Sequence, residues 1–265
     1  MKCTVLTDNY TRTGTLYLGE AGFSCLLEAD GKTVLFDTGY SDVFLRNADK
    51  LGLKPEQADM VVLSHGHDDH TGGLQPLLDR LPPDHRPQLV AHPGVFAHRT
   101  IREREAGCPL SQEALSQRMD LRLSADPVWL TEHLVFLGEI PELVEQRAPC
   151  GVLPDGTPDR CLDDSALAYV GGSGVYLLTG CSHSGICNMA EYAKQVTGQR
   201  CIAGILGGFH LLQRDERSRR TIAYLDRESV AELWPCHCTC FKVRMEMARS
   251  LEIGEVSAGM TLEWN

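Results

Sequence analysis

The sequence predicts a layered α/β protein, and three observations lead to that fold class. Short apolar runs bounded by turn residues recur along the chain, as strands do in layered folds. From residue 60 onward these runs alternate with segments of helical periodicity, which favours strand and helix layers around one core. No linker rich in Pro, Gly or Ser divides the 265 residues. We therefore expect a single domain over residues 1–265.

The first expected element is a hairpin, formed by residues 23–28 and 33–37 around Asp30-Gly31, a dipeptide typical of tight turns. Residues 60–63 are apolar without alternation, as in a strand covered on both faces. The next element is a helix, because four leucines fall at i, i+3, i+4 and i+7 before Pro82-Pro83. These leucines are Leu74, Leu77, Leu78 and Leu81.

The later elements follow from the same patterns. Strands are expected at residues 89–91, 134–137, 166–170, 175–179, 202–206 and 230–234. Helices are expected at residues 189–196, 217–226 and 241–251. The stretch from about residue 100 to 160 is less regular. We expect it to be an insertion near the mouth of a site or at an oligomer contact.

The composition excludes several classes of function. A formal net charge of −11 repels polyanions and argues against general nucleic-acid binding. No run of 18 apolar residues exists, so no membrane span is expected. The N-terminal residues lack the apolar run of an export signal, which favours a cytoplasmic location. Eleven cysteines cannot all pair within one chain, and we expect them mostly as thiols.

The strongest chemical signal is the segment of residues 64–73, which directly follows a buried strand. It holds His65, His67, Asp69 and His70, and imidazole and carboxylate groups are the usual ligands of Zn and related ions. In an extended segment His65 and His67 point to one side, and after a turn Asp69 and His70 come toward a second ion. Asp68 lies off this pattern, so solvent or a supporting contact is expected for it.

These residues match in full the H-x-H-x-D-H signature of the metallo-β-lactamase superfamily, which the sequence resembles. The resemblance implies a four-layered αββα sandwich and two divalent ions. Upstream, residues 36–39 resemble the superfamily motif whose aspartate, here Asp37, supports the metal-binding loop without ligating. A buried carboxylate there could accept hydrogen bonds from the loop or from a ligating His. The alternative is that Asp37 simply forms a turn.

Two later motifs, residues 180–186 and 235–240, each place a His just beyond a predicted strand, where site loops gather. They resemble the later metal motifs of the superfamily, which implies that His183 and His237 are ligands. Cys181 and Asp164 compete for the bridging position, and spacing does not separate Asp163 from Asp164. His210 also ends a strand, and either substrate contact or a structural role fits it.

The motif at residues 235–240 also contains Cys236, Cys238 and Cys240, which invites an iron–sulfur or soft-metal cluster as an alternative. Alternation turns these thiols away from His237, and no second cysteine-rich hairpin supplies a fourth ligand, so the cluster is not favoured. The motifs together, over residues 34–240, resemble the subfamily labelled dihydropterin-methyl-ribofuranosyl-aminobenzene-phosphate synthase. Asp68 and Cys240 depart from its pattern, which commonly has Tyr and Gly there.

The expected activity follows from two bound divalent ions. Zn is the expected metal, and Fe and Mn are the alternatives. Two ions lower the pKa of a bridging water from about 16 toward 7, so a metal-bound hydroxide could hydrolyse a small anionic substrate. Phosphodiesters, cyclic phosphates, thioesters and lactones fit, with Asp69 as the catalytic residue. One alternative is transfer of a pterin-methyl group from its diphosphate to an arylamine ribose phosphate. A second is a metal-dependent ligand-binding or sensing protein. A homodimer is the default assembly.

Overall fold

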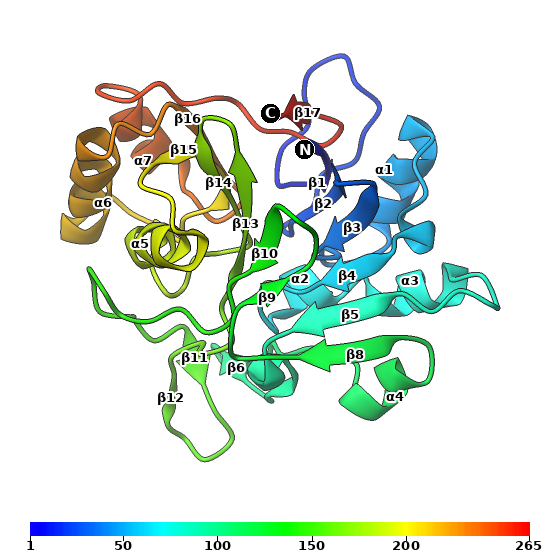
Figure 1. The fold of residues 1–265 in the computed structure, drawn as a ribbon. Coiled ribbons are helices and arrows are strands. Elements are labelled where there is room, and N and C mark those ends of the chain that lie inside the picture. Colours follow the sequence, from blue (N-terminus) through cyan, green and yellow to red (C-terminus); the bar gives the residue numbers. More distant parts are fainter.

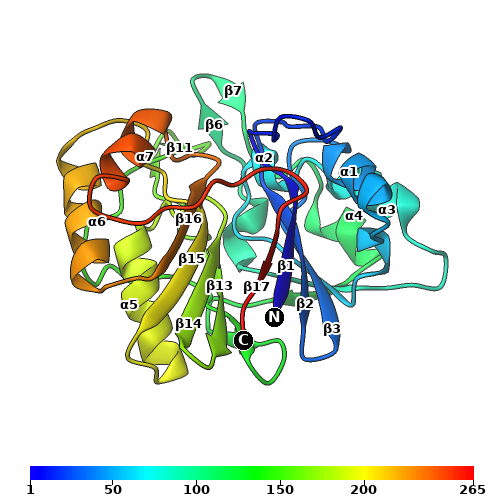
Figure 2. The ribbon, with the colours of Figure 1, turned by 90° about the horizontal axis from the view of Figure 1, so that it is seen from above.

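Two β-sheets pack face to face in the computed structural model, which describes residues 1–265, and helices cover both outer faces (Figures 1 and 2). The first sheet has the strand order β17-β1-β2-β3-β4-β5-β8, and the second has β16-β15-β14-β13-β10-β9. The chain thus forms four layers, helix, sheet, sheet and helix. The predicted αββα sandwich is confirmed.

The strands of the first sheet change from antiparallel to parallel at β3, which pairs with β2 on one side and β4 on the other. Their bounds are β1 Lys2–Thr7, β2 Ser24–Ala29, β3 Lys32–Phe36, β4 Met60–Val62, β5 Gln88–Ala91, β8 Asp120–Leu123 and β17 Thr261–Glu263. The expected hairpin joins β2 and β3. Asp30 and Gly31 both have positive φ, 50° and 74°, as a tight two-residue hairpin turn requires.

The second sheet is parallel across β14, β15 and β16 and antiparallel elsewhere. Its strands are β9 Val128–Trp129, β10 Leu134–Phe136, β13 Ala166–Gly171, β14 Gly174–Thr179, β15 Ile202–Gly208 and β16 Glu232–Cys236. A third, small sheet has the order β12-β11-β6-β7. Its strands are β6 Thr100–Ile101, β7 Arg104–Glu105, β11 Gly151–Val152 and β12 Pro158–Asp159.

Helices pack on the outer face of each sheet (Figure 2). The first sheet carries α1 Val43–Leu51, α3 Leu74–Arg80 and α4 Gln112–Ser116, and the second carries α5 Ile186–Thr197, α6 Glu216–Arg227 and α7 Phe241–Met247. Two 3₁₀ turns, η1 Pro55–Gln57 and η2 Pro93–Phe96, and the short α2 Asp68–Thr71 complete the fold. The helix expected over residues 241–251 ends earlier, at Met247, and Ile253 then forms a bridge with Leu233.

Apolar side chains form three clusters, one in each space between the four layers of the sandwich. The cluster between the sheets includes Phe23, Phe36 and Leu178, all without solvent exposure. Separate clusters lie under the helices on each side. Residues 100–160 contribute to all three sheets, and both the insertion and the single domain stay predictions. No helix is both long and apolar enough to cross a bilayer.

Candidate metal centre

The carboxyl ends of five strands meet at one edge of the sandwich. Within the first sheet β3 and β4 are parallel, and within the second β14, β15 and β16 are parallel, so the strands of each set end on the same side. Each end carries one of the singled-out residues or motifs. Asp37 follows β3 and the 64–73 segment follows β4, while His183, His210 and His237 follow β14, β15 and β16. Ser165 N also donates to Ser64 O at 2.8 Å, which joins the two sheets at this edge. Loops at such an edge commonly form sites.

Three imidazoles, those of His65, His67 and His183, form the first set of converging donors, which we call the three-histidine group. His65 Nε2 lies 2.9 Å from His67 Nδ1, and His67 Nδ1 lies 3.1 Å from His183 Nε2. All three rings are at most 3% exposed. Gly66 permits this arrangement, because a Cβ there would lie 2.1 Å from Val95 O.

A second set, the mixed group, consists of Asp69, His70, Cys181 and His237. His70 Nε2 lies 3.2 Å from His237 Nε2 and 3.3 Å from Cys181 Sγ. Asp69 Oδ2 lies 3.3 Å from His237 Nε2. The Asp69 side chain is 29% exposed, so this group opens toward solvent while the three-histidine group is enclosed.

Hydrogen bonds on the outward ring nitrogens set the tautomers of three ligand candidates. His70 Nδ1 donates to Asp37 Oδ2 at 2.7 Å, and His65 Nδ1 donates to Ser64 Oγ at 2.9 Å. Ser64 Oγ in turn donates to Asp37 Oδ2 at 2.7 Å, and Ser64 N donates to Asp37 Oδ1 at 2.7 Å. His237 Nδ1 donates to Asn9 Oδ1 at 2.9 Å. In the neutral form of each ring, the inward nitrogen carries a lone pair that faces the cluster.

Burial and nearby charge separate the two groups electrostatically. Burial lowers the pKa of His65 and His183 well below the usual value, and it lowers the pKa of His67 to about 3. Burial opposes a charge on His70 too, but the Asp69 and Asp37 carboxylates outweigh it and raise its pKa to about 9. His70 and His237 hold the pKa of Asp69 far below its usual value despite burial.

Four non-glycine residues at the strand ends adopt positive φ. They are Asp37 at 56°, Ser182 at 59°, His210 at 46° and His237 at 48°. Such conformations cost free energy and persist only where surrounding contacts enforce them, often at functional sites. Here they turn the chain at the end of β3, β14, β15 and β16, where the loops of the cluster begin.

The structure brings Cys181, and not Asp164, into the cluster. Asp164 Oδ2 accepts hydrogen bonds from Ser184 N at 2.8 Å and from Ser184 Oγ at 2.6 Å, so this carboxylate orders the loop beside His183. Asp163 supports a different loop. Its Oδ2 accepts a hydrogen bond from Gly66 N at 2.8 Å, and its Oδ1 accepts one from Arg99 Nη2 at 3.1 Å. The two adjacent aspartates therefore support the two histidine loops separately.

His210 lies beside the three-histidine group, with its ring centroid 4.2 Å from that of His183. Its backbone N–H donates to Cys238 Sγ at 3.2 Å, and its buried Nδ1 has no partner within the chain. The three cysteines of the 235–240 motif do not converge. Cys236 is buried in the core between the sheets, while Cys240 packs against the core under α5, α6 and α7.

Two residues that support His237, Asp8 and Asn9, are only weakly signalled in the sequence: they follow a short strand and could line the pocket, but a plain turn is the commoner role of such a pair. In the structure Asp8 Oδ1 accepts from His237 N at 2.9 Å and Asn9 orients the His237 ring. Burial raises the pKa of Asp8. Asp68, expected to meet solvent or a supporting contact, forms an ion pair with Arg104 of β7.

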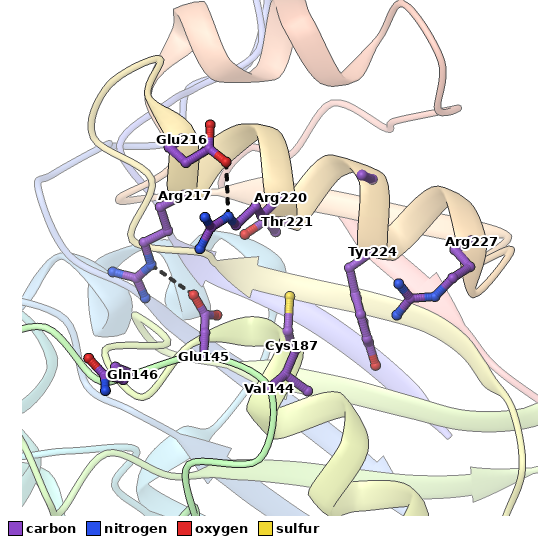
Figure 3. Close-up of a pocket in the computed structure, with 11 residues that line it drawn as sticks. Val144, Glu145, Gln146, Cys187, Glu216, Arg217, Arg220, Thr221, Tyr224 and Arg227 are labelled. Atoms are coloured by element: carbon purple, nitrogen blue, oxygen red, sulfur yellow. Dashed lines mark hydrogen bonds and ion pairs between the residues drawn. The ribbon is translucent and has the colours of Figure 1, made fainter.

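A cavity of about 680 Å³ lies away from this centre, against α6 and residues 144–146 (Figure 3). Its arginines already have partners, since Arg217 pairs with Glu145 and Arg220 with Glu216. None of the candidate metal ligands lines it. The candidate site is therefore defined by the donor cluster and not by this cavity.

The donor atoms fit divalent ions. Ligands about 2.1 Å from a tetrahedral ion lie about 3.4 Å apart, and the nitrogen, oxygen and sulfur separations above are close to that value. In the three-histidine group, buried and unprotonated ring nitrogens aimed at one another repel unless a cation lies between them. Imidazole, carboxylate and thiolate donors suit Zn and related transition metals.

This fold, with His-rich loops at one edge of an αββα sandwich, defines a metallo-β-lactamase-like enzyme. The model of the metallo-β-lactamase superfamily matches residues 18–187, and the chain belongs to this superfamily.

Particular relatives are similar over almost the whole chain. A 7,8-dihydropterin-6-methyl-4-(β-D-ribofuranosyl)-aminobenzene-5′-phosphate synthase of Methanocaldococcus jannaschii is 31% identical over 262 residues, 91% of this chain and 88% of the relative. An uncharacterized protein of the same organism is 32% identical over 240 residues, 88% of this chain and 89% of that protein. The crystal structure of Tm1679, described as a metal-dependent hydrolase of the β-lactamase superfamily, has a TM-score of 0.85 and 29% identity, with 99% and 98% of the two chains covered.

Proposed function

We propose that the chain is a hydrolase that holds two divalent ions and acts on a small anionic substrate. The observation that carries this proposal is the pair of adjacent donor groups, whose inward atoms lie close to the separations expected of ion ligands. The three-histidine group would hold one ion and the mixed group the other. Zn is the first choice, with Fe and Mn as alternatives.

When bound, such ions supply Lewis acidity and lower the pKa of a coordinated water. The chain's own residues then determine geometry. Asp69 is the acid of the mixed group and is partly open to solvent, so it is placed to orient a water and accept its proton as well as to ligate. His210 adjoins His183 and is placed to contact a substrate bound beside the three-histidine group.

The substrate class follows from charge. Two ions outweigh the acidic surface locally, so an anionic group would be attracted to the cluster even though the net charge is −11. Phosphodiesters and cyclic phosphates suit a two-ion site because both the attacking and the leaving oxygen carry charge. Thioesters and lactones suit it because one ion can polarise the carbonyl.

A second function is favoured by the named relative. Its synthase name, at 31% identity over 91% of this chain, supports transfer of a pterin-methyl group from a diphosphate to an arylamine ribose phosphate. In that reaction the same residues would hold ions that bind the diphosphate leaving group, and Asp69 would not need to orient a water.

The test is to purify the chain without added metal, measure its Zn, Fe and Mn, and assay the metal-loaded protein. The substrates are bis(p-nitrophenyl) phosphate, a homoserine lactone, and the pterin diphosphate with the arylamine. We expect about two ions per chain and turnover of at least one hydrolytic substrate. Turnover of the pterin pair alone would replace the hydrolase by the transferase. No bound ion and no turnover would reject both.

A further inference from the structure

The outward ring nitrogen of His67 lies beside sulfur atoms, whereas those of His65, His70 and His237 donate to oxygen atoms. His67 Nδ1 faces the cluster, and His67 Nε2 lies 4.0 Å from Cys150 Sγ and 3.9 Å from Cys161 Sγ. These two cysteines form a disulfide, whereas the other nine are free. The sequence prediction did not single out this pair among the expected thiols. It is the one disulfide of the chain, and it lies directly behind a candidate metal ligand.

We propose that Cys150 and Cys161 are a redox-exchangeable pair whose state sets the outer hydrogen bond of His67 and thereby the affinity of the three-histidine group for its ion. This inference rests on the proposed metal-binding function. A ligating imidazole is normally oriented by an acceptor for its outer N–H. Reduced sulfur beside Nε2 supplies that acceptor, while the sulfurs of a disulfide are poorer acceptors.

The environment of the pair suits thiol–disulfide exchange. Cys150 is partly exposed and Cys161 is fully buried, so an attacking thiolate reaches Cys150. Arg99 Nη1 lies 3.9 Å from Cys161 Sγ, and the guanidinium, itself only 2% exposed, stabilises negative charge on the sulfur that leaves. Exchange is faster when the leaving sulfur is stabilised in this way.

The reduction balances with a dithiol as the co-reactant. One thiolate of the dithiol attacks Cys150 Sγ, the S–S bond breaks, and Cys161 leaves with the bonding electron pair. The second thiol of the reagent then attacks the reagent sulfur bound to Cys150, which forms the reagent's own disulfide and frees Cys150. Two electrons and two protons pass from the dithiol to the protein. The reverse sequence, with a disulfide reagent, restores the bond.

The experiment equilibrates zinc-loaded, full-length protein in buffers of reduced and oxidised dithiothreitol. The crosslink between Cys150 and Cys161 is measured by alkylation and mass spectrometry, and zinc retention by competition with a chromogenic chelator. We expect one zinc per chain to be held about 10- to 100-fold more weakly in the oxidised form, the range typical for loss of an outer partner of a ligand. The crosslink and the zinc affinity should change together over the redox series.

Two variants separate this role from a structural one. Cys150→Ser keeps the Cys161 sulfur beside His67 but cannot crosslink, so its zinc affinity should stay at the reduced level in every buffer. The double variant Cys150→Ala/Cys161→Ala removes both sulfurs beside His67, so its zinc affinity should stay at the oxidised level in every buffer. Cys201→Ser, at an exposed free thiol, is the matched control and should behave as the unaltered chain. If a variant does not fold, the redox series on the unaltered chain still decides.

The failures are distinguishable. Two zinc ions held equally in both redox states, or a pair that dithiothreitol never reduces in the folded protein, would overturn this inference and leave the proposed function standing. A chain that binds no zinc in either state would overturn both.

Discussion

The three-histidine group and the mixed group lie side by side, but the donors that would hold their ions differ in charge. The first offers only neutral imidazoles, because burial lowers the pKa of His65, His67 and His183. The second contains the Asp69 carboxylate and the Cys181 sulfur, and Asp37 lies behind His70. Anionic donors offset the charge of a cation, so we expect the mixed group to bind more tightly.

The two groups also have different roles in the proposed reaction. The enclosed three-histidine group has no acid among its donors, whereas the mixed group has one that is 29% exposed. Chemistry that moves a proton therefore depends on the mixed group. The three-histidine group depends on its supporting contacts to keep an ion, which is where the Cys150–Cys161 pair acts in our inference.

The largest effect is expected from Asp69→Asn. The substitution removes the negative charge and the proton acceptor of the mixed group, and loss of a positioned acid or base commonly lowers the rate by about 10²- to 10⁴-fold. We expect kcat/KM for a phosphodiester to fall by about 10³-fold. The control is its neighbour Asp68→Asn, which loses only the ion pair with Arg104. Equal losses in the two variants would show that Asp69 has no special role.

A smaller loss is expected from removing one imidazole of each group. His183→Ala and His237→Ala should each lower the ion count from about two per chain to about one, with kcat/KM lowered at least about 100-fold. Cobalt distinguishes which ion is left. Absorption from thiolate to cobalt requires Cys181, so it should survive in His183→Ala and weaken in His237→Ala. The same spectrum in both variants would contradict the division into two groups.

Asp37→Asn tests the carboxylate that supports both groups. Asp37 accepts from His70 Nδ1 directly and reaches His65 through Ser64 Oγ. Asparagine keeps one acceptor oxygen but loses the charge, so we expect ion affinity to fall about 10- to 100-fold. Chelator competition measures this, and the ion of the mixed group should be released first. Release of both ions in parallel would show that Asp37 acts equally on the two groups.

The sequence predicted best what is local. Residues 64–73 hold four of the candidate ligands within six positions, and strand alternation with the following turn is enough to bring them together. The layered α/β fold followed from the alternation of strands and helices. The four-layered sandwich followed from the family resemblance, which also pointed to His183 and His237.

What the sequence could not predict depends on the packing of distant segments. Asn9 reaches His237 across 228 positions, and the position of Asp8-Asn9 after a strand does not identify that partner. Cys181 and Asp164 remained tied because position along the chain does not show which of the two side chains faces the histidines. Only the fold shows that Ser184 engages Asp164 and leaves Cys181 facing His70.

A last effect, on stability, concerns Asp164, the carboxylate behind the three-histidine group. Burial raises its pKa to about 6 from 3.8, although hydrogen bonds from Ser184 oppose the rise. The folded chain therefore keeps a proton that the unfolded chain loses, so this residue's contribution to stability falls as pH rises from about 4 to 6 and stays lost above. Asp164→Asn carries no such proton and still offers an oxygen to Ser184.

We therefore compare the free energy of unfolding of Asp164→Asn with that of the unaltered chain at two pH values. The difference should favour the variant more at pH 8 than at pH 4, by about 2–3 kcal/mol for a shift of about two pKa units. Urea unfolding of chelator-treated protein at both values measures this difference, which cancels the pH-independent effect of the amide. Asp84→Asn, at an exposed position, is the control and should show no such change. A difference that does not vary with pH would mean that folding does not raise the pKa of Asp164.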